Sequence, residues 1–361
     1  MIVSFQRTEL EECPADVLGS GAVLLGGDVT CDGFHKNRRI RIQTHAHEDH
    51  LNDFATSKSG IIVLTKATQR LLENKHRDLP YRPNVHALEY GKTIELYDNI
   101  IELYSSNHIL GAAQAKVTTP DGVIIGYSGD FGWPIEDIMQ VDILVVDATY
   151  GTPSQKSRTY TQVEAQQEFV NRARSLLRQG PLHICASLGP LQRALYALET
   201  EEISDGVTII ASKHVKYVVD VHTEFGLPMP SIACTGTPEA QEAIRSGSYI
   251  KLHGTYEVMN DGLVDGGVIQ LTRYRVDGQE PIIQTADNRF RIGFSNHADF
   301  DQTIEYIHST GAHLVVTDWV RASKGRNNES NKAVQLAKAV RRELRIQAFP
   351  ASGHTDLLWG S

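Results

Sequence analysis

The chain has 361 residues, of which 41% are hydrophobic, and its formal net charge is −9 at pH 7. This length exceeds what one hydrophobic core usually organises, so we expect two domains, or one domain that carries a large insertion. The acidic balance argues against a broad basic surface for nucleic acid, although bound divalent metals would add positive charge that the count omits.

Apolar runs and cysteine spacing indicate where the protein is expected to work. No run of about 18 apolar residues occurs, and the N-terminus has no apolar stretch typical of a signal peptide. The four cysteines show no C-x-x-C spacing, which argues against a disulfide framework and against a cysteine-based zinc site. We therefore expect a cytoplasmic protein without membrane contact.

A dense group of histidine and acidic side chains follows the first strand-rich region. Residues 21–42 are typical of short strands broken by glycine turns, and the run 39–43 leads directly into the group. Four potential ligands then lie within six residues: His45, His47, Asp49 and His50. Alternation along a strand would point the first two the same way. A single histidine is usually structural, but this density predicts a metal site.

The next elements bring two more candidate ligands. A strand over 61–64 and a helix over 65–74 precede a hairpin over 93–105. His108 comes between this hairpin and a glycine turn, so it can project into a cleft at a strand end. Asp130 ends an apolar strand, where a carboxylate can bridge two metal ions.

These motifs resemble the metallo-β-lactamase superfamily. The pattern H-x-H-x-D-H is similar to its signature, residues 107–114 resemble the G-H-x-x-G-S-A-Q element of its nuclease branch, and residues 128–130 resemble its S-G-D element. The resemblance implies that one metal is held by His45, His47 and His108. It further implies that Asp49 and His50 face a second metal and that Asp130 bridges the two.

The acidic residue that follows the next strand differs between subfamilies of this superfamily. Asp147 ends the strand-like run 141–147 and is followed by Ala-Thr-Tyr. This resembles the first specific motif of the β-CASP nucleases, an acid followed by S-T-Y or T-T-Y. Most RNA-processing members carry Glu at this position, whereas the Artemis-like DNA nucleases carry Asp, as this chain does.

From about residue 161 helices and strands alternate, which predicts a parallel sheet with crossover helices. The expected elements are helices over 163–178, 191–200 and 217–225 and strands over 183–187 and 207–210. Ser187 and Gly189 lie in a turn that resembles a family strand-to-helix turn, whose amides could hold a phosphate. The family's basic residue after the glycine is Pro190 here, so either Arg193 replaces it or Arg193 only faces solvent.

The last motifs lie near the C-terminus. Residues 295–299 resemble the second β-CASP motif, which implies that His297 sits near the scissile phosphate and pairs with Asp147, with Ser295 as a further contact. Helices over 301–309 and 331–344 and a strand over 345–349 complete this region. The strand 312–318 ends in Asp318, where RNA-processing members have a metal-binding histidine. This carboxylate either favours a hard ion such as Mn²⁺ or Mg²⁺, or leaves the second site weak or empty.

The combined resemblance covers the chain from His45 to about Phe349. It implies an α/β fold, namely a metallo-β-lactamase αββα sandwich interrupted by an inserted β-CASP α/β domain, with parts 1–158, 159–288 and 289–361. Two divalent ions, Zn or Mn with Mg as an option at the second site, would generate hydroxide at neutral pH. Asp49, Asp147 and His297 are the expected catalytic residues, the last two by positioning the phosphate and assisting the leaving oxygen.

The expected partner is nucleic acid. Asp147, Asp318 and the turn at Gly189 favour DNA and resemble DNA-repair exonucleases, including the ligase-associated group. An RNA-processing nuclease on the same scaffold is the first alternative, and a catalytically silent nucleic-acid-binding subunit is the second. The full set of candidate ligands opposes the silent subunit, and the inserted domain disfavours a small-molecule hydrolase.

Overall fold

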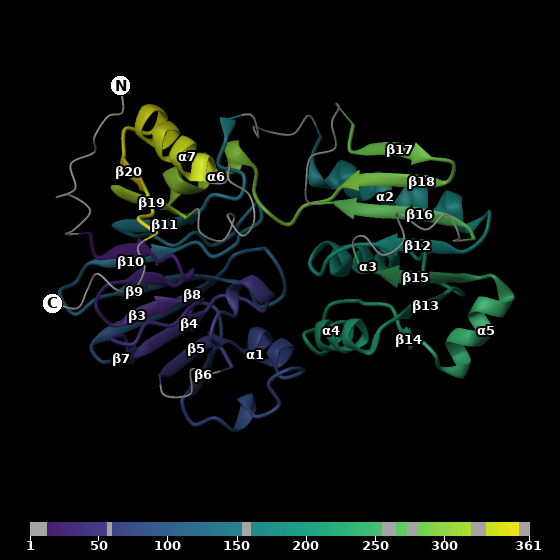
Figure 1. Cartoon of the computed structure of the whole chain (residues 1–361), viewed down its shortest axis with the longest axis horizontal. Helices are drawn as coiled ribbons and strands as arrows, with labels where there is room; N and C mark the ends of the chain where they lie inside the picture. Colours follow the sequence, from purple (N-terminus) through teal and green to yellow (C-terminus); the bar gives the residue numbers. More distant parts are fainter. Residues whose placement is uncertain are drawn as a thin grey trace. The chain divides into compact units, whose positions relative to one another are not determined.

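The computed structural model describes residues 13–55, 60–153, 160–254, 265–272, 280–318 and 330–353 (Figure 1). The chain forms two compact units, one made of residues 1–156 and 297–361 and the other of residues 157–296. Strands and helices are mixed in both, which confirms the α/β class. The second boundary lies after Asn296 and not at 288/289, because β18 (Arg289–Gly293) pairs within the sheet of the second unit.

The first unit contains two sheets that share one apolar core. One sheet has the order β1 (Ala15–Val17), β2 (Val23–Leu25), β3 (Val29–Cys31), β4 (Ile40–Gln43), β5 (Ile61–Thr65) and β6 (Val85–Leu88). The other has the order β20 (Gln347–Pro350), β19 (Leu314–Asp318), β11 (Ile143–Asp147), β10 (Ile124–Tyr127), β9 (Ala113–Thr118), β8 (Asn99–Ser105) and β7 (Thr93–Leu96). Ile42 of the first sheet and Leu103 and Tyr127 of the second are fully buried in the core between them.

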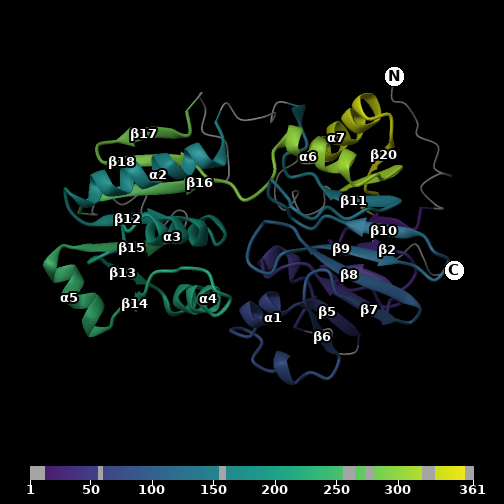
Figure 2. The same ribbon diagram turned by 180° about the vertical axis from the view of Figure 1, so that it is seen from behind.

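Helices cover the outer face of each sheet of the first unit (Figure 2). Leu72 of α1 (Lys66–Leu72) packs with Ile62 and Leu64 of the first sheet. Apolar side chains of α6 (Phe300–Ser309) and α7 (Ser330–Glu343) pack on the second sheet around Leu144 and Val315. The layers are therefore helix, sheet, sheet, helix, with most apolar burial along the strands.

Strand direction gathers polar residues at one edge of the second sheet. Strand β11 runs parallel to both β10 and β19, and Asp147 and Asp318 are direct neighbours in register. The carboxyl ends of these strands therefore meet at the same edge, as in other parallel arrangements. Asp130 follows β10 by three residues and comes to that edge as well.

The second unit is built on one mainly parallel sheet, as the alternating pattern predicted. Its order is β14 (Ile232–Cys234), β13 (Thr208–Ala211), β15 (Tyr249–His253), β12 (Leu182–Cys185), β16 (Gly267–Thr272), β18 and β17 (Ile282–Ala286), and only β17 is antiparallel among these described strands. Four helices connect the strands: α2 (Gln162–Leu177), α3 (Pro190–Thr200), α4 (Lys213–Glu224) and α5 (Pro238–Ser246). The short elements β14 and α5 were not predicted.

The buried His183, which contacts the partly buried His253, gives the stability of the second unit a pH dependence. Burial and the neighbouring His253 lower the pKa of His183 to about 4, and its Nδ1 lies 2.9 Å from the Nε2 of His253. The unfolded chain, with a histidine pKa near 6.5, binds more protons below that pH, so acid favours unfolding. We expect His183 to account for a loss of about 2 kcal/mol of unfolding free energy between pH 7 and pH 5.

Urea unfolding followed by circular dichroism at the two pH values checks this expectation. A His183→Gln variant should show a smaller loss between pH 7 and pH 5 than the unchanged chain. The matched change at the exposed His313, His313→Gln, should leave the difference as it was. Equal pH dependence in the His183→Gln variant and the unchanged chain would show that this pair does not control the acid sensitivity.

Two absences hold for the described part of the chain. None of its helices is long and apolar enough to cross a membrane. None of the four cysteines, all of which lie in that part, forms a disulfide.

Candidate metal centre

The H-x-H-x-D-H segment lies beyond the end of a strand. β4 ends at Gln43, so His45 and His47 follow it in a connecting segment and not on the strand as expected, with His47 in extended backbone at φ −73° and ψ 144°. The single 3₁₀ turn Glu48–His50 comes next. His45 and His50 are completely buried there, which takes their imidazoles out of water.

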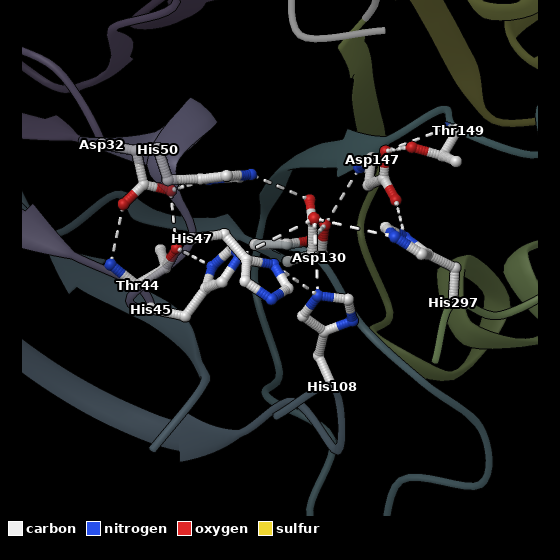
Figure 3. Close-up of polar contacts among 12 residues, drawn as sticks. Asp32, Thr44, His45, His47, His50, His108, Asp130, Asp147, Thr149 and His297 are labelled. Carbon is white, nitrogen blue, oxygen red and sulfur yellow. Dashed lines mark hydrogen bonds and ion pairs between the residues drawn. The ribbon is translucent and has the colours of Figure 1, made fainter. Parts of the chain in front are cut away.

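Three imidazole nitrogens converge in front of this segment (Figure 3). His45 Nε2 and His108 Nε2 each lie 3.2 Å from His47 Nδ1. Asp130 Oδ2 lies 3.8 Å from His45 Nε2 and 3.7 Å from His108 Nε2. Ligand atoms around a tetrahedral ion with bonds of about 2.0–2.1 Å are roughly 3.3 Å apart. The spacing of these donor atoms therefore fits a single metal ion.

The ionisation state of the group also suits a metal. Burial, reinforced by neighbouring histidines, lowers the pKa of His45 and of His47 well below the ordinary value, so both imidazoles are neutral. Burial by itself would raise the pKa of Asp130, but His50, His297 and His45 around it outweigh burial and hold it well below its usual value. Neutral imidazoles beside a carboxylate are the state in which these side chains bind metals.

The loop that carries His108 is held in an unusual backbone conformation. Asn107 adopts a left-handed conformation at φ 52°, where the related element has glycine, and its Nδ2 donates to the carbonyl of Pro134 over 2.7 Å. Asparagine tolerates this region better than most residues. Ser106 donates from its hydroxyl to the carbonyl of Asp130, which ties the His108 loop to the Asp130 loop.

Gly111 closes the same loop against helix α1. Its carbonyl accepts hydrogen bonds from the hydroxyls of Thr65 and Thr68, at 2.7 and 2.9 Å. Its φ is +81°, and an added Cβ would lie 2.5 Å from the Thr68 nitrogen. Gly91 has a similar φ of +70°, but an added Cβ there would meet nothing within 4 Å.

This contrast predicts unequal costs for the same substitution. Gly111→Ala should lower the free energy of unfolding by about 3 kcal/mol, since it combines a left-handed backbone with steric overlap. Gly91→Ala should cost about 1 kcal/mol, because only the backbone conformation is unfavourable. Urea unfolding of the two variants measures both values, and similar costs would contradict the close packing at Gly111.

Asp32 is a central residue that the sequence analysis did not identify. It is completely buried, and its carboxylate accepts from the Thr44 backbone over 2.7 Å, from the Thr44 hydroxyl over 2.5 Å and from Gln43 Nε2 over 3.1 Å. His50 Nδ1 lies 2.8 Å from the same carboxylate. Residues 32 and 33 look like an ordinary Asp-Gly turn in the sequence. The only local signal was their place before the H-x-H-x-D-H segment.

The contacts of Asp32 fix which nitrogen of two histidines carries the proton. His50 donates its Nδ1 proton to Asp32, so the neutral form of its ring carries a lone pair on Nε2, 3.3 Å from Asp130 Oδ1. The Thr44 hydroxyl already donates to Asp32, so it accepts from His45 Nδ1 over 3.0 Å. In the neutral form of both rings, the Nε2 atoms therefore face the centre unprotonated, which is the tautomer a metal requires.

Asp147 and His297 form a polar pair beside the group of His45, His47, His108 and Asp130. His297 Nδ1 lies 3.3 Å from Asp147 Oδ2, and His297 Nε2 lies 3.9 Å from Asp130 Oδ2. The structure thus brings together both residues expected from the β-CASP motifs and places them next to Asp130 (Figure 3). The Asp299 side chain caps α6 at Gln302, which fixes the start of the helix just after His297.

Two expected ligands are not gathered into the centre. The three groups of potential metal ligands among the described residues are His45, His47, His108 and Asp130; Asp32, His45 and His50; and Asp130, Asp147 and His297. Asp49 is exposed on the 3₁₀ turn and belongs to none of them. Asp318 is buried beside Asp147 in register, but it also lies outside these groups.

The expected phosphate contacts belong to the second unit. Ser187 is exposed, and Gly189, with φ 95°, is the N-cap that precedes helix α3. Arg193 contacts Gln162 and Gln166 and stacks on Phe294, so its guanidinium is held within the unit. The backbone nitrogen of Ser295 donates to Gln162 Oε1 over 3.0 Å.

The fold and the site together define an α/β protein with a candidate metal centre of histidine and aspartate side chains. No protein-family model matches the chain. It is 35% identical over 143 residues to an uncharacterized protein in the lig 3′ region of Acidianus ambivalens, a match that covers 39% of this chain and 99% of that protein. The chain belongs to the family of this uncharacterized protein.

Two further similarities are more distant. An RNase J-like protein of Methanocaldococcus jannaschii is 28% identical over 134 residues, which is 31% of this chain and 32% of that protein. The match thus spans about a third of the RNase J-like protein. A solved structure of a protein of unknown function from Enterococcus faecalis has a TM-score of 0.52 at 14% identity and covers 79% of this chain and 76% of its own. This last likeness concerns the fold alone.

Proposed function

We propose that the protein is a metal-dependent nuclease that hydrolyses phosphodiester bonds of DNA, as an exonuclease in repair or end processing. The observation that carries the proposal is the convergence of two arrangements on one carboxylate. Asp130 lies within 4 Å of His45 and His108 of the candidate metal group and of His297 of the polar pair. A metal site beside a histidine that pairs with an aspartate is suited to phosphoryl transfer, because negative charge develops on the phosphate oxygens in that reaction.

The candidate ligands suggest which residues hold metal. His45, His47, His108 and Asp130 would hold one ion, zinc or manganese, because imidazole suits zinc and carboxylate suits manganese. His50 and Asp130 would face a second ion, with Asp49 or Asp318 completing its ligands and favouring manganese or magnesium. When bound, such ions supply hydroxide from water at neutral pH and neutralise phosphate charge.

The Asp147–His297 pair would act on the substrate directly. His297 Nδ1 faces the Asp147 carboxylate, so its Nε2 is the atom that can contact a phosphate oxygen or donate a proton to the leaving oxygen. Asp147 orients the imidazole and stabilises its protonated form. We assign Asp49 to the same catalytic group as a candidate base, on the family resemblance.

The family architecture belongs to the same proposal. We infer that the first unit is a metallo-β-lactamase domain and that the second is a β-CASP domain. Support comes from the helix, sheet, sheet, helix layers, the order of the five motifs and the partial match to the RNase J-like protein. The proposed contacts to the phosphate backbone of the nucleic acid are then Ser187, Gly189, Arg193 and Ser295.

An RNA-processing nuclease is the second candidate, and the comparison with the RNase J-like protein favours it. Asp147 in place of Glu and Asp318 in place of His favour DNA. Digestion of end-labelled single-stranded DNA and RNA of one sequence, with Zn²⁺, Mn²⁺ or Mg²⁺, separates the two. Stepwise shortening of DNA with RNA spared supports the proposal. Preferential loss of RNA transfers the protein to the second candidate, and no cleavage with any metal contradicts both.

A further inference from the structure

The carboxylate of Asp147 is held from both sides. Thr149 donates to Asp147 Oδ1 twice, from its backbone nitrogen over 2.9 Å and from its hydroxyl over 2.8 Å. The backbone nitrogen of Asp147 donates to the hydroxyl of Ser128 over 3.0 Å, which fixes the main chain at the same residue. Because Oδ1 already accepts two hydrogen bonds, Oδ2 is the oxygen that remains for His297 Nδ1, 3.3 Å away.

We infer that Thr149 is a positioning residue that acts on His297 through Asp147. By fixing the carboxylate, it keeps a proton of His297 on Nδ1 and leaves Nε2 to face Asp130 and the substrate. The neighbouring rings limit how far this imidazole can turn, since His108 and Tyr150 lie with centroids 4.6 and 6.1 Å from it. The inference rests on the proposed function, in which His297 contacts the scissile phosphate.

The hydroxyl and the methyl group of Thr149 can be tested separately. Thr149→Val keeps the shape and the backbone donor but replaces the hydroxyl with a methyl group, so the carboxylate gains rotational freedom. Thr149→Ser keeps the hydroxyl. Thr149 is only partly buried, which makes both substitutions compatible with folding. Thr200→Val is a matched control, because Thr200 is an exposed helix residue whose hydroxyl contacts the carbonyl of Tyr196.

The first readout is the imidazole proton of His297 in the metal-free protein. A hydrogen-bonded Nδ1 proton exchanges slowly with water and gives a separate low-field proton resonance, which ¹⁵N-labelled histidine and a His297→Gln variant assign. We expect this resonance in the unchanged chain, in Thr149→Ser and in Thr200→Val, and its loss in Thr149→Val. Its absence from the unchanged chain, or its persistence in Thr149→Val, overturns the inference.

The second readout is hydrolysis by the metal-loaded protein. Thr149→Val should lower kcat about tenfold at nearly unchanged KM and metal content, since one charge-assisted hydrogen bond is lost. Thr149→Ser should restore most of the rate. Equal loss in both variants would overturn the role of the hydroxyl. If the unchanged chain cuts no nucleic acid, the proposed function fails, whereas the proton resonance still decides whether Thr149 positions His297.

Asp147→Asn provides an independent check on the same geometry. The two donors of Thr149 should claim the amide oxygen of the new side chain, so its NH₂ group faces His297 Nδ1. That nitrogen must then accept, and the proton moves to Nε2. We expect the low-field Nδ1 resonance to disappear in this variant as well. Retention of the Nδ1 proton beside the new amide would show that Thr149 does not control the orientation.

Discussion

Asp130→Asn is expected to empty the metal centre and to lower hydrolysis by about 1,000-fold, roughly 4 kcal/mol of transition-state stabilisation. The carboxylate is the point at which the polar groups meet, with four imidazoles within 4 Å: those of His45, His50, His108 and His297. Asparagine keeps the shape of the side chain but carries no charge to balance a divalent ion. Its amide group would also donate hydrogen bonds to the imidazole nitrogens whose lone pairs a metal ion needs.

The fold should survive this change. Asp130 contributes no apolar surface to the sheet core, and its backbone carbonyl can still accept from Ser106. The measurement combines metal content after dialysis, hydrolysis of end-labelled DNA and a circular dichroism spectrum. Asp78→Asn is a suitable control, because Asp78 is an exposed acid that pairs with Arg82 away from the metal group. A fully loaded and active Asp130→Asn variant would remove Asp130 from the centre.

The sequence predicted the elements of the fold better than their exact bounds. Strand alternation and helix periodicity gave β5, β12, β13 and helices α2, α3, α6 and α7 to within a few residues. β14 has three residues, too few for a period to emerge. β4 ends before His45, so the convergence of His45 and His47 depends on contacts with other segments and not on strand alternation.

The candidate site likewise contains residues that the sequence identified and residues that it did not. Motif positions identified the residues that meet at Asp130, and Asp130 and Asp147 lie at or just after the ends of parallel strands that reach the same edge. The hydrogen bonds that support them depend on how the chain turns and packs, which the motifs by themselves do not show. Thr149 donates to Asp147 because of the turn after β11, and Asp32 reaches His50 across 18 residues. The exposed position of Asp49 likewise follows from the 3₁₀ turn, which spacing alone does not reveal.

Asp32→Asn is expected to weaken metal binding about 10- to 100-fold. Asp32 is not in the group His45, His47, His108 and Asp130, but it supports the neighbouring His45 and His50. Its carboxylate accepts from four donors: the Thr44 nitrogen and hydroxyl, Gln43 Nε2 and His50 Nδ1. An amide offers one oxygen and one NH₂ group, so at least one side meets donor against donor. The Thr44 nitrogen cannot change roles, and the amide oxygen will therefore turn towards it.

The NH₂ group of the introduced amide then faces the Thr44 hydroxyl and His50. His50 must accept at Nδ1 and move its proton to Nε2, and the Thr44 hydroxyl must accept from the amide and donate to His45 Nδ1. Both imidazoles lose the Nε2 lone pairs that face Asp130. Metal titration of Asp32→Asn against Asp28→Asn, a change in a partly exposed pair with Arg39, measures the effect. Equal affinities would mean that the tautomers of His45 and His50 are set by the metal itself and not by Asp32.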